Sequence, residues 1–225
     1  MTEPRNNQRS PALRESDKVE DELRRLILSL ELEPGLAVSE AALISRFGWG
    51  RTPLREAFQR LAEQSLLQII PHHGVVIMPL SLFDFVEVMD AMGVVIGPAA
   101  AMACQRMSED ELGQLERLLE RSQAVANTAE GFTELAEIDY EFHRLLAQAT
   151  GNRYLSRYLL HLHRVAERFN LAAWQRDRQI APSLQEHRTI VTALQRRDAE
   201  AARTAMLAHI EAARQRVLGT MQTDG

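Results

Sequence analysis

Apolar residues in the first third of the chain recur at the spacing of amphipathic helices. The first helix is predicted to bury one stripe, which consists of Val19, Leu23, Leu26, Ile27 and Leu30. Glu33-Pro34-Gly35 should end this helix and turn the chain. A short second helix is predicted from Ser39, a good N-cap, to Gly48, and a third from near Thr52-Pro53 to about Gln64.

The hydrophobic pattern then changes to that of a β-hairpin. Residues 66–70 and 75–78 are apolar runs of strand length, and Pro71-His72-His73-Gly74 lies between them. Three helices followed by a hairpin are the element order of a winged helix-turn-helix. We therefore predict such a domain over residues 16–80, preceded by a polar tail, residues 1–15, that should be disordered.

The rest of the chain, residues 81–219, carries helical periodicity throughout and predicts an all-α bundle of six or seven helices. The fold class is therefore mainly α. Ser108 and Glu111 have the spacing of a capping box, and Ser183 and Asp198 are the predicted N-caps of the last two helices. A kink is expected in the first helix of the bundle, where Gly93, Gly97 and Pro98 occur.

Composition limits what the protein can bind and where it works. The chain has 225 residues, 45% of them hydrophobic, and a net charge of −5, so DNA contact would need a local basic patch. Its single cysteine, Cys104, lies in an apolar run and is expected to be a buried, inert thiol. Since it has neither 18 consecutive apolar residues nor an N-terminal apolar segment, we expect a cytoplasmic protein without a membrane span.

The predicted third helix carries such a basic patch. Residues 46–60 contain four arginines and one acidic residue, Glu56. Arg51 and Arg55 share a face at the start of the helix, and a guanidinium can bond both O6 and N7 of guanine. The other candidate DNA contacts are Thr52, for phosphate, and the hairpin tip with His72, His73 and Gly74. The alternative is a solvated helix face, which is the usual role of two arginines at this spacing.

The same segment resembles a known family. Residues 39–43 (SEAAL), 51–57 (RTPLREA), Leu61 and 73–76 (HGVV) are similar to the signature of GntR-superfamily regulators. The resemblance covers about residues 17–80 and implies a DNA-binding winged helix-turn-helix. It departs at Trp49-Gly50, where the family usually has a small apolar residue and then Ser or Thr. Gly50 lacks the hydroxyl that would cap the helix and touch phosphate.

The helical region contains residues with metal-binding chemistry. Asp139 and His143 are four residues apart, so they lie on one helix face, and His187 and His209 are on the last two predicted helices. Three imidazoles and a carboxylate could hold Zn²⁺, Ni²⁺, Mn²⁺ or Fe²⁺ with open positions for a ligand. By spacing alone, surface or core histidines are the more common explanation. His161 and His163 are expected at the surface.

A second resemblance bears on these residues. Residues 81–218 look like the FCD effector domain of the FadR branch, through Asp139-x-x-Phe142-His143, Asn152-x-x-Leu155, Glu186-His187-x-x-Ile190 and His209. The resemblance implies that Asp139, His143, His187 and His209 bind a divalent metal, which binds a carboxylate-bearing metabolite. Such domains often carry an effector-binding arginine on their first helix, but this chain has no Lys or Arg between Arg60 and Arg106.

Together these features predict a bacterial transcription regulator, expected to be a repressor and not an enzyme. A homodimer on a short inverted repeat of DNA would supply the selectivity that one small unit lacks. Phe83, Val86 and Met89 form an apolar stripe that is either a dimer surface or plain core. Two other functions stay open: an all-helical metal-dependent hydrolase with Glu141 or Glu186 as base, and a DNA-binding protein whose helical domain only dimerises.

Overall fold

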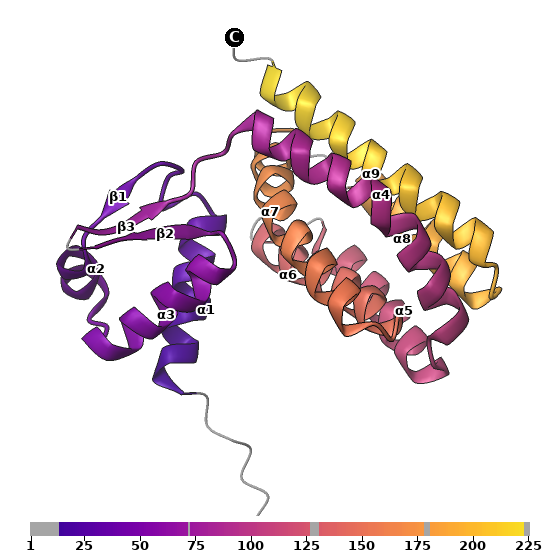
Figure 1. Ribbon diagram of the computed structural model, residues 1–225, viewed down its shortest axis with the longest axis horizontal. Helices are drawn as coiled ribbons and strands as arrows, with labels where there is room; N and C mark the ends of the chain where they lie inside the picture. The colour runs from indigo at the N-terminus through magenta and orange to yellow at the C-terminus, as the bar shows by residue number, and fades with distance from the viewer. Residues whose placement is uncertain (1–13, 72, 127–130, 178–180, 223–225) are drawn as a thin grey trace, which may run out of the picture.

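A computed structural model describes residues 14–71, 73–126, 131–177 and 181–222, and it divides into a small N-terminal unit and a larger helical bundle (Figure 1). The predicted tail, residues 1–15, lies almost wholly outside the described residues. Only its end is seen, and there Glu15 already begins the first helix. The predicted boundary between the two units, at residues 80 and 81, falls in the short link between the last strand and the next helix.

The N-terminal unit is the predicted winged helix-turn-helix. Its helices are α1 (Glu15–Leu28), α2 (Glu40–Phe47) and α3 (Arg51–Glu63). Its strands are β1 (Ala37–Val38), β2 (Leu67–Ile70) and β3 (Gly74–Ile77), which form an antiparallel sheet in the order β1-β3-β2. The hairpin of β2 and β3 is the predicted one, whereas β1 was not predicted because two residues are too few to show alternation.

Local capping chemistry fixes the ends of α2 as the sequence predicts. The Ser39 side chain accepts a hydrogen bond from the backbone N–H of Ala42 at 3.1 Å. Gly48 ends the helix in the left-handed conformation, with φ 74°.

The apolar stripes of the three helices and the inner face of the sheet meet in one core. Its most buried members include Leu23, Leu26, Leu43, Leu54, Leu61 and Ile77.

The bundle contains six helices within the described residues, which agrees with the predicted six or seven. They are α4 (Leu82–Arg106), α5 (Glu109–Val125), α6 (Gly131–Ala149), α7 (Arg153–Asp177), α8 (Ala181–Gln195) and α9 (Ala199–Gln222). The long helices α4 and α9 lie side by side (Figure 1). Helix α4 also packs against α6 and α7, so it is central to the bundle.

Helix α4 is long and apolar enough to cross a membrane by length and composition, and part of it is buried inside the bundle. Phe85, Met92 and Ala103 on α4 are almost fully buried among the other helices. The helix continues without a break through Gly93, Gly97 and Pro98. At Gly97 an added Cβ would lie 3.0 Å from the side chain of Leu207, so this glycine permits the close approach of α9.

The residues singled out on α4 divide between core and surface. Of the stripe that predicted either a dimer surface or plain core, Met89 is buried, Val86 is half-buried and Phe83 is exposed. Cys104 is fully buried, and burial raises the pKa of its thiol, as expected for an inert cysteine.

Two of the three predicted caps in the bundle are confirmed. Ser108 and Glu111 form the reciprocal capping box, and the Asp198 carboxylate accepts from the N–H of Ala201 at 3.0 Å. The prediction that Ser183 caps α8 is wrong, because this helix already begins at Ala181 and Ser183 lies buried in its first turn. Proline is compatible with the first turn of a helix, so Pro182 does not delay the start.

The two units contact each other through α6 and α7, which lie on the side of the bundle that faces the N-terminal unit (Figure 1). Leu135, Ala136, Leu171 and Trp174 from these helices belong to the same buried apolar cluster as the core of the N-terminal unit. The Arg168 guanidinium on α7 also donates a hydrogen bond to the backbone carbonyl of Met78, just after β3. The N-terminal unit is thus attached to the bundle by packing as well as by the chain.

Candidate metal centre and candidate nucleic-acid interface

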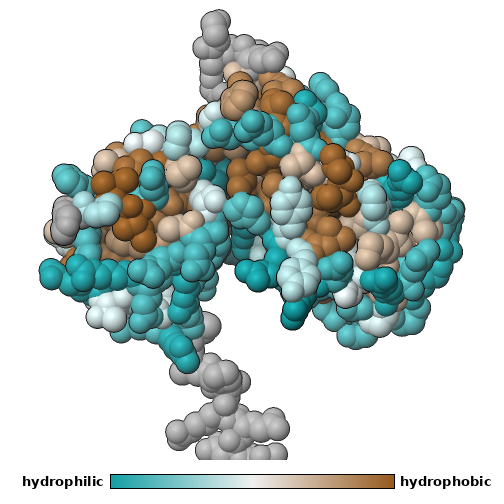
Figure 2. Space-filling view, viewed as in Figure 1, coloured by the Kyte–Doolittle hydropathy of each residue, from teal (hydrophilic) through white to brown (hydrophobic). Residues whose placement is uncertain are grey.

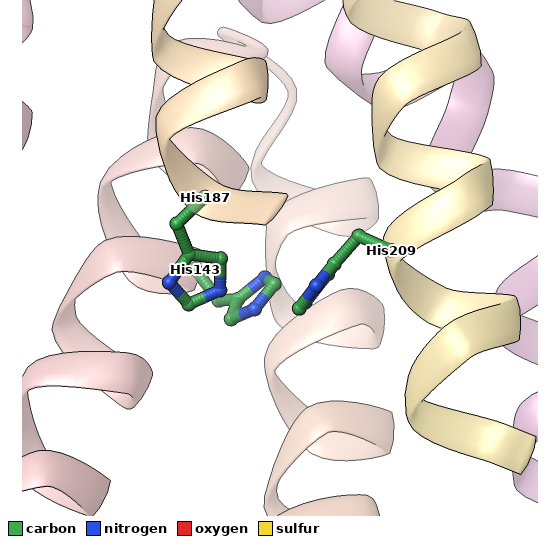
Figure 3. A group of neighbouring side chains, drawn as sticks. All are labelled: His143, His187 and His209. Atoms are coloured by element: carbon green, nitrogen blue, oxygen red, sulfur yellow. The ribbon is translucent and has the colours of Figure 1, made fainter. Parts of the chain in front are cut away.

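The four predicted metal ligands converge at the centre of the bundle. Asp139 and His143 come from α6, His187 from α8 and His209 from α9, and all four side chains are buried. The three imidazole rings turn toward one another (Figure 3). One nitrogen from each ring lies within 4.8 Å of the others, which is close enough for a single metal ion to bind all three.

A fifth buried residue, His163 on α7, joins this cluster, so the prediction that it lies at the surface is wrong. Only 4% of His163 is exposed, and it forms a second close group with Asp139 and His143. His161 is exposed, as predicted. Residues two apart project from different sides of a helix, so only one of these histidines can face inward. Leu159 and Ala166 are buried on the same side as His163, and this apolar spacing is the signal that could have identified it.

Burial controls the charges of the cluster. Removal from water, together with the neighbouring imidazoles, holds the pKa of His143 and of His187 well below the ordinary value. Burial also lowers the pKa of His163 to about 3. These rings are therefore neutral and keep a lone pair for a metal. Burial and nearby Glu167 raise the pKa of Asp139 to about 8, an effect that the positive charge of Arg216 only partly offsets.

Glu186 fixes the orientation of the His209 imidazole. Its carboxylate accepts a hydrogen bond from His209 Nδ1 at 2.8 Å, so the opposite ring nitrogen, Nε2, is the one that can serve a metal. Arg216 binds the same carboxylate through both terminal nitrogens, at 2.6 and 2.9 Å. Burial alone would raise the pKa of Glu186, but these two partners hold it below its usual value. Sequence spacing alone does not predict this orienting contact, because Glu186 and His209 lie on different helices.

The donor set fits a divalent metal ion. The Nε2 atoms of His163 and His187 are buried without a hydrogen-bond partner, which is costly unless a ligand satisfies them. A cavity of about 10 Å³ lies at the centre of this cluster. It is lined by Asp139, His143, His163, His209 and Arg216, among others. This volume is room for one small species, such as an ion or a water molecule, and too little for a metabolite.

The predicted DNA contacts gather around one groove of the N-terminal unit. A groove of about 540 Å³ is lined by Arg51 and Arg55 at the start of α3. On its other side it is lined by His73 and Gly74 of the wing, which is the hairpin of β2 and β3. The two arginine side chains are 71% and 63% exposed, and Thr52 is exposed beside them. His72, the other residue predicted at the tip, lies outside the described residues.

Glu40, which sequence reasoning missed, holds both arginines. One of its oxygens lies 3.1 Å from Arg51 Nε and the other 2.8 Å from Arg55 Nε. Glu40 is the first residue of α2, so it connects the two helices of the helix-turn-helix. Since the terminal guanidinium nitrogens carry the donors that would reach guanine, this carboxylate can position the arginines without blocking them.

Two glycines near this groove have different roles. Gly50 is the N-cap of α3 and makes no side-chain cap, as its lack of a hydroxyl predicts. The third helical residue, Pro53, has no N–H to offer a cap either. Gly74 has φ +97°, and an added Cβ would lie 2.4 Å from the carbonyl oxygen of Val38. The wing therefore needs glycine there for the fold itself.

Comparison with known families identifies both units. The model of the FCD domain matches residues 87–212, more than half of the chain, and that of the bacterial regulatory proteins of the gntR family matches residues 15–77. The chain belongs to the GntR family. This GntR regulator therefore combines a DNA-binding winged helix-turn-helix with an FCD domain, as the sequence resemblance implied.

Relatives of this GntR protein include named repressors. It is 29% identical to the HTH-type transcriptional repressor RspR of Escherichia coli, over 84% of this chain and 82% of RspR. It is 24% identical to the galactonate operon transcriptional repressor of the same species, over 91% and 97% of the two chains. The solved structure of E. coli McbR/YncC shares the fold, with TM-score 0.76, 18% identity, and coverage of 95% and 100%. The GntR protein is a transcription regulator and not an enzyme.

Proposed function

We propose that this protein is a repressor that binds a short inverted repeat of DNA as a homodimer in the bacterial cytoplasm. A divalent metal ion and a small organic acid in the FCD domain control its affinity for DNA. The observation that carries the proposal is the convergence of buried, neutral imidazoles and a buried carboxylate in a domain separate from the exposed arginines of α3.

The ligands of the ion are Asp139, His143, His187 and His209, and its identity is Zn²⁺, Ni²⁺, Mn²⁺ or Fe²⁺. When bound, such an ion supplies a Lewis-acidic position for a carboxylate oxygen of the effector. Arg216 lines the same cavity from α9. It supplies a positive charge in the effector domain, whose first helix lacks the arginine often found in this domain type.

Effector binding must change the positions of the helices. The cavity beside the imidazoles is water-sized, so an organic acid can enter only if the surrounding helices separate. Helix α7 lines this cavity and also contacts the N-terminal unit. Movement of α7 would therefore reposition the two DNA-reading units of a dimer, and such coupling is typically worth about 1–3 kcal/mol.

On DNA, α3 enters the major groove and Arg51 and Arg55 contact base edges. Thr52 contacts phosphate at the helix start, and the wing residues His73 and Gly74 approach the backbone or minor groove. The support for these roles is that all five residues are at the exposed helix start or wing of one unit, four of them around a single groove.

The DNA-binding part is tested by selecting duplexes from a random pool with the purified protein. Arg51→Ala and Arg55→Ala should each weaken binding to the selected duplex by about 1–3 kcal/mol and relax its sequence preference. Arg121→Ala is the control, because Arg121 is also an exposed arginine in a surface ion pair but belongs to α5. If both α3 variants bind like the wild type, α3 is not the recognition helix.

The metal and effector are tested on the FCD domain of the same protein. Elemental analysis should find one bound divalent ion per chain, and His187→Ala should lower this content while the protein still binds the selected duplex. A thermal-shift screen of organic acids, with and without chelator, should find an acid whose stabilising effect requires the metal. A protein that binds DNA but no metal and no acid would have an FCD domain that only dimerises.

A further inference from the structure

His163 is the one imidazole of the central cluster that the predicted ligand set leaves without a role. It comes from α7, whereas the other four donors come from α6, α8 and α9. The side chain is 4% exposed, and its Nε2 atom has no hydrogen-bond partner. A buried polar atom without a partner destabilises the fold, and plain core packing does not explain why a histidine stands at this position.

The unpartnered nitrogen faces a ligand of the proposed ion. His163 Nε2 lies 3.4 Å from Asp139 Oδ2, and His187 Nε2 lies 3.4 Å from the other oxygen, Asp139 Oδ1. Neither nitrogen forms a hydrogen bond there. The carboxylate thus stands between two imidazoles with unpartnered nitrogens, which is an arrangement that a cation would satisfy and that apolar packing would not.

The donor group that contains this nitrogen adjoins the proposed metal site. Two groups of donors have their ligand atoms within 4.8 Å, namely His143 with His187 and His209, and Asp139 with His143 and His163. His143 is common to both, and the ring centres of His143 and His163 are 4.3 Å apart. The two groups therefore meet at His143, and one ion beside this ring would bind donors from both after small shifts of the side chains.

We infer that His163 is a fifth protein ligand of the metal ion, beside Asp139, His143, His187 and His209, and that it selects an ion that accepts more than four ligands. This inference rests on the proposed metal centre. Zinc in a site without an open position is almost always four-coordinate, whereas Ni²⁺, Co²⁺, Mn²⁺ and Fe²⁺ accept six nitrogen and oxygen ligands. Five protein donors thus favour the latter group over zinc.

The ligand count also limits the effector. With five positions taken by the protein, a six-coordinate ion has one position left for an oxygen atom from outside. The effector class is therefore an acid that gives the metal one oxygen atom and places its second carboxylate oxygen elsewhere, with Arg216 as the nearest cation lining the cavity.

Cobalt(II) is the probe that tests this assignment, since its visible absorption is weak in five- or six-coordinate sites and much stronger in four-coordinate ones. The full-length protein is stripped with chelator, reloaded with Co²⁺ and titrated with Ni²⁺ and Zn²⁺ in competition. The wild type should give the weak spectrum. His163→Ala and the size-conserving His163→Gln should give the stronger one, with Co²⁺ affinity lowered at least about tenfold and a preference shifted toward Zn²⁺.

The control is His161→Ala, which removes an exposed imidazole from the same helix and should leave spectrum and affinity unchanged. Circular dichroism of each metal-free variant shows whether it is folded. Folded His163 variants with the wild-type spectrum and affinity would overturn the inference while leaving the metal centre intact. Absence of Co²⁺ binding by the wild type would instead overturn the proposed metal centre.

Discussion

At the scale of single residues, the local conformation of Gly74 leads to a prediction about the wing. Its φ of +97° is unfavourable for any residue with a side chain, and a Cβ would clash with the Val38 carbonyl at 2.4 Å. Gly74→Ala should destabilise the N-terminal unit by about 2–4 kcal/mol. Urea unfolding monitored by circular dichroism measures this loss, and binding to the selected duplex should fall with it.

The matched control for this change is Gly219→Ala, because Gly219 is an exposed helical glycine where an added Cβ meets nothing within 4 Å. It should leave stability unchanged or slightly raised, since alanine favours the helix. An alanine at position 74 with wild-type stability would show that β3 can shift away from Val38.

The histidines show how far the sequence could predict the site. Asp139 and His143 were recognised because i, i+4 spacing on one helix places two donors together. His187 and His209 required the family resemblance, because sequence spacing does not show which helix faces meet. His163 was missed because it was considered as a pair with His161 rather than with the buried spacing of Leu159 and Ala166. Glu40 was missed because its contact with α3 depends on how two helices cross.

At the scale of elements, long periodic helices were predictable and short or context-dependent features were not. The six bundle helices follow from their apolar spacing and their caps, such as Ser108 with Glu111. Strand β1 has only two residues and exists because it pairs with β3, so its own sequence carries no pattern. With Ser183 as its N-cap, α8 is predicted to start three residues later than its observed start at Ala181, although proline is compatible with a first helical turn.

Helix α7 contacts the N-terminal unit through Arg168. This contact leads to a prediction about how the metal site influences DNA affinity. Arg168 is buried, with a pKa lowered to about 10 by loss of solvation, and it donates to the Met78 carbonyl beyond β3. Arg168→Met keeps the apolar stem but removes this donor. We expect the effect of metal removal on DNA affinity to shrink toward zero, with the metal affinity itself unchanged.

The measurement is a fluorescence-anisotropy titration of the selected duplex, with metal-loaded and chelator-treated protein. Arg157→Met is the control, because Arg157 is an exposed arginine of the same helix and should retain the wild-type difference. A wild-type difference in Arg168→Met would mean that the signal reaches the N-terminal unit by another contact, such as the apolar cluster around Leu171 and Trp174.

At the scale of the whole molecule, apolar residues remain exposed where α4 and α9 lie side by side. Figure 2 shows hydrophobic residues gathered over this part of the bundle. Phe83 and Val94 are 71% and 75% exposed, and a groove of about 410 Å³ beside Val94 is lined by Leu207 and Ile210 from α9. For the proposed homodimer, a second copy of the chain is the expected occupant of this groove, because an inverted repeat of DNA would require two-fold symmetry and two-fold interfaces pair a surface with itself.

A single charge in this surface should separate the two chains of the proposed dimer and so lower the affinity for DNA. Val94→Asp would place a carboxylate in this contact, where it would lose its water beside Asp90 and Glu211 of the same groove. Arg214 also lines the groove, but it is already paired with Asp90. We expect sedimentation velocity to show a monomer and the affinity for the full inverted repeat to fall at least about tenfold, because one unit then holds only half of the site. Affinity for a single half-site should not change, since α3 and the wing lie in the other unit.

The control is Gln148→Asp, which adds the same charge at an exposed position of α6 and should remain dimeric. If Val94→Asp also remains dimeric, the two copies meet through another face and α4 is exposed for a different partner.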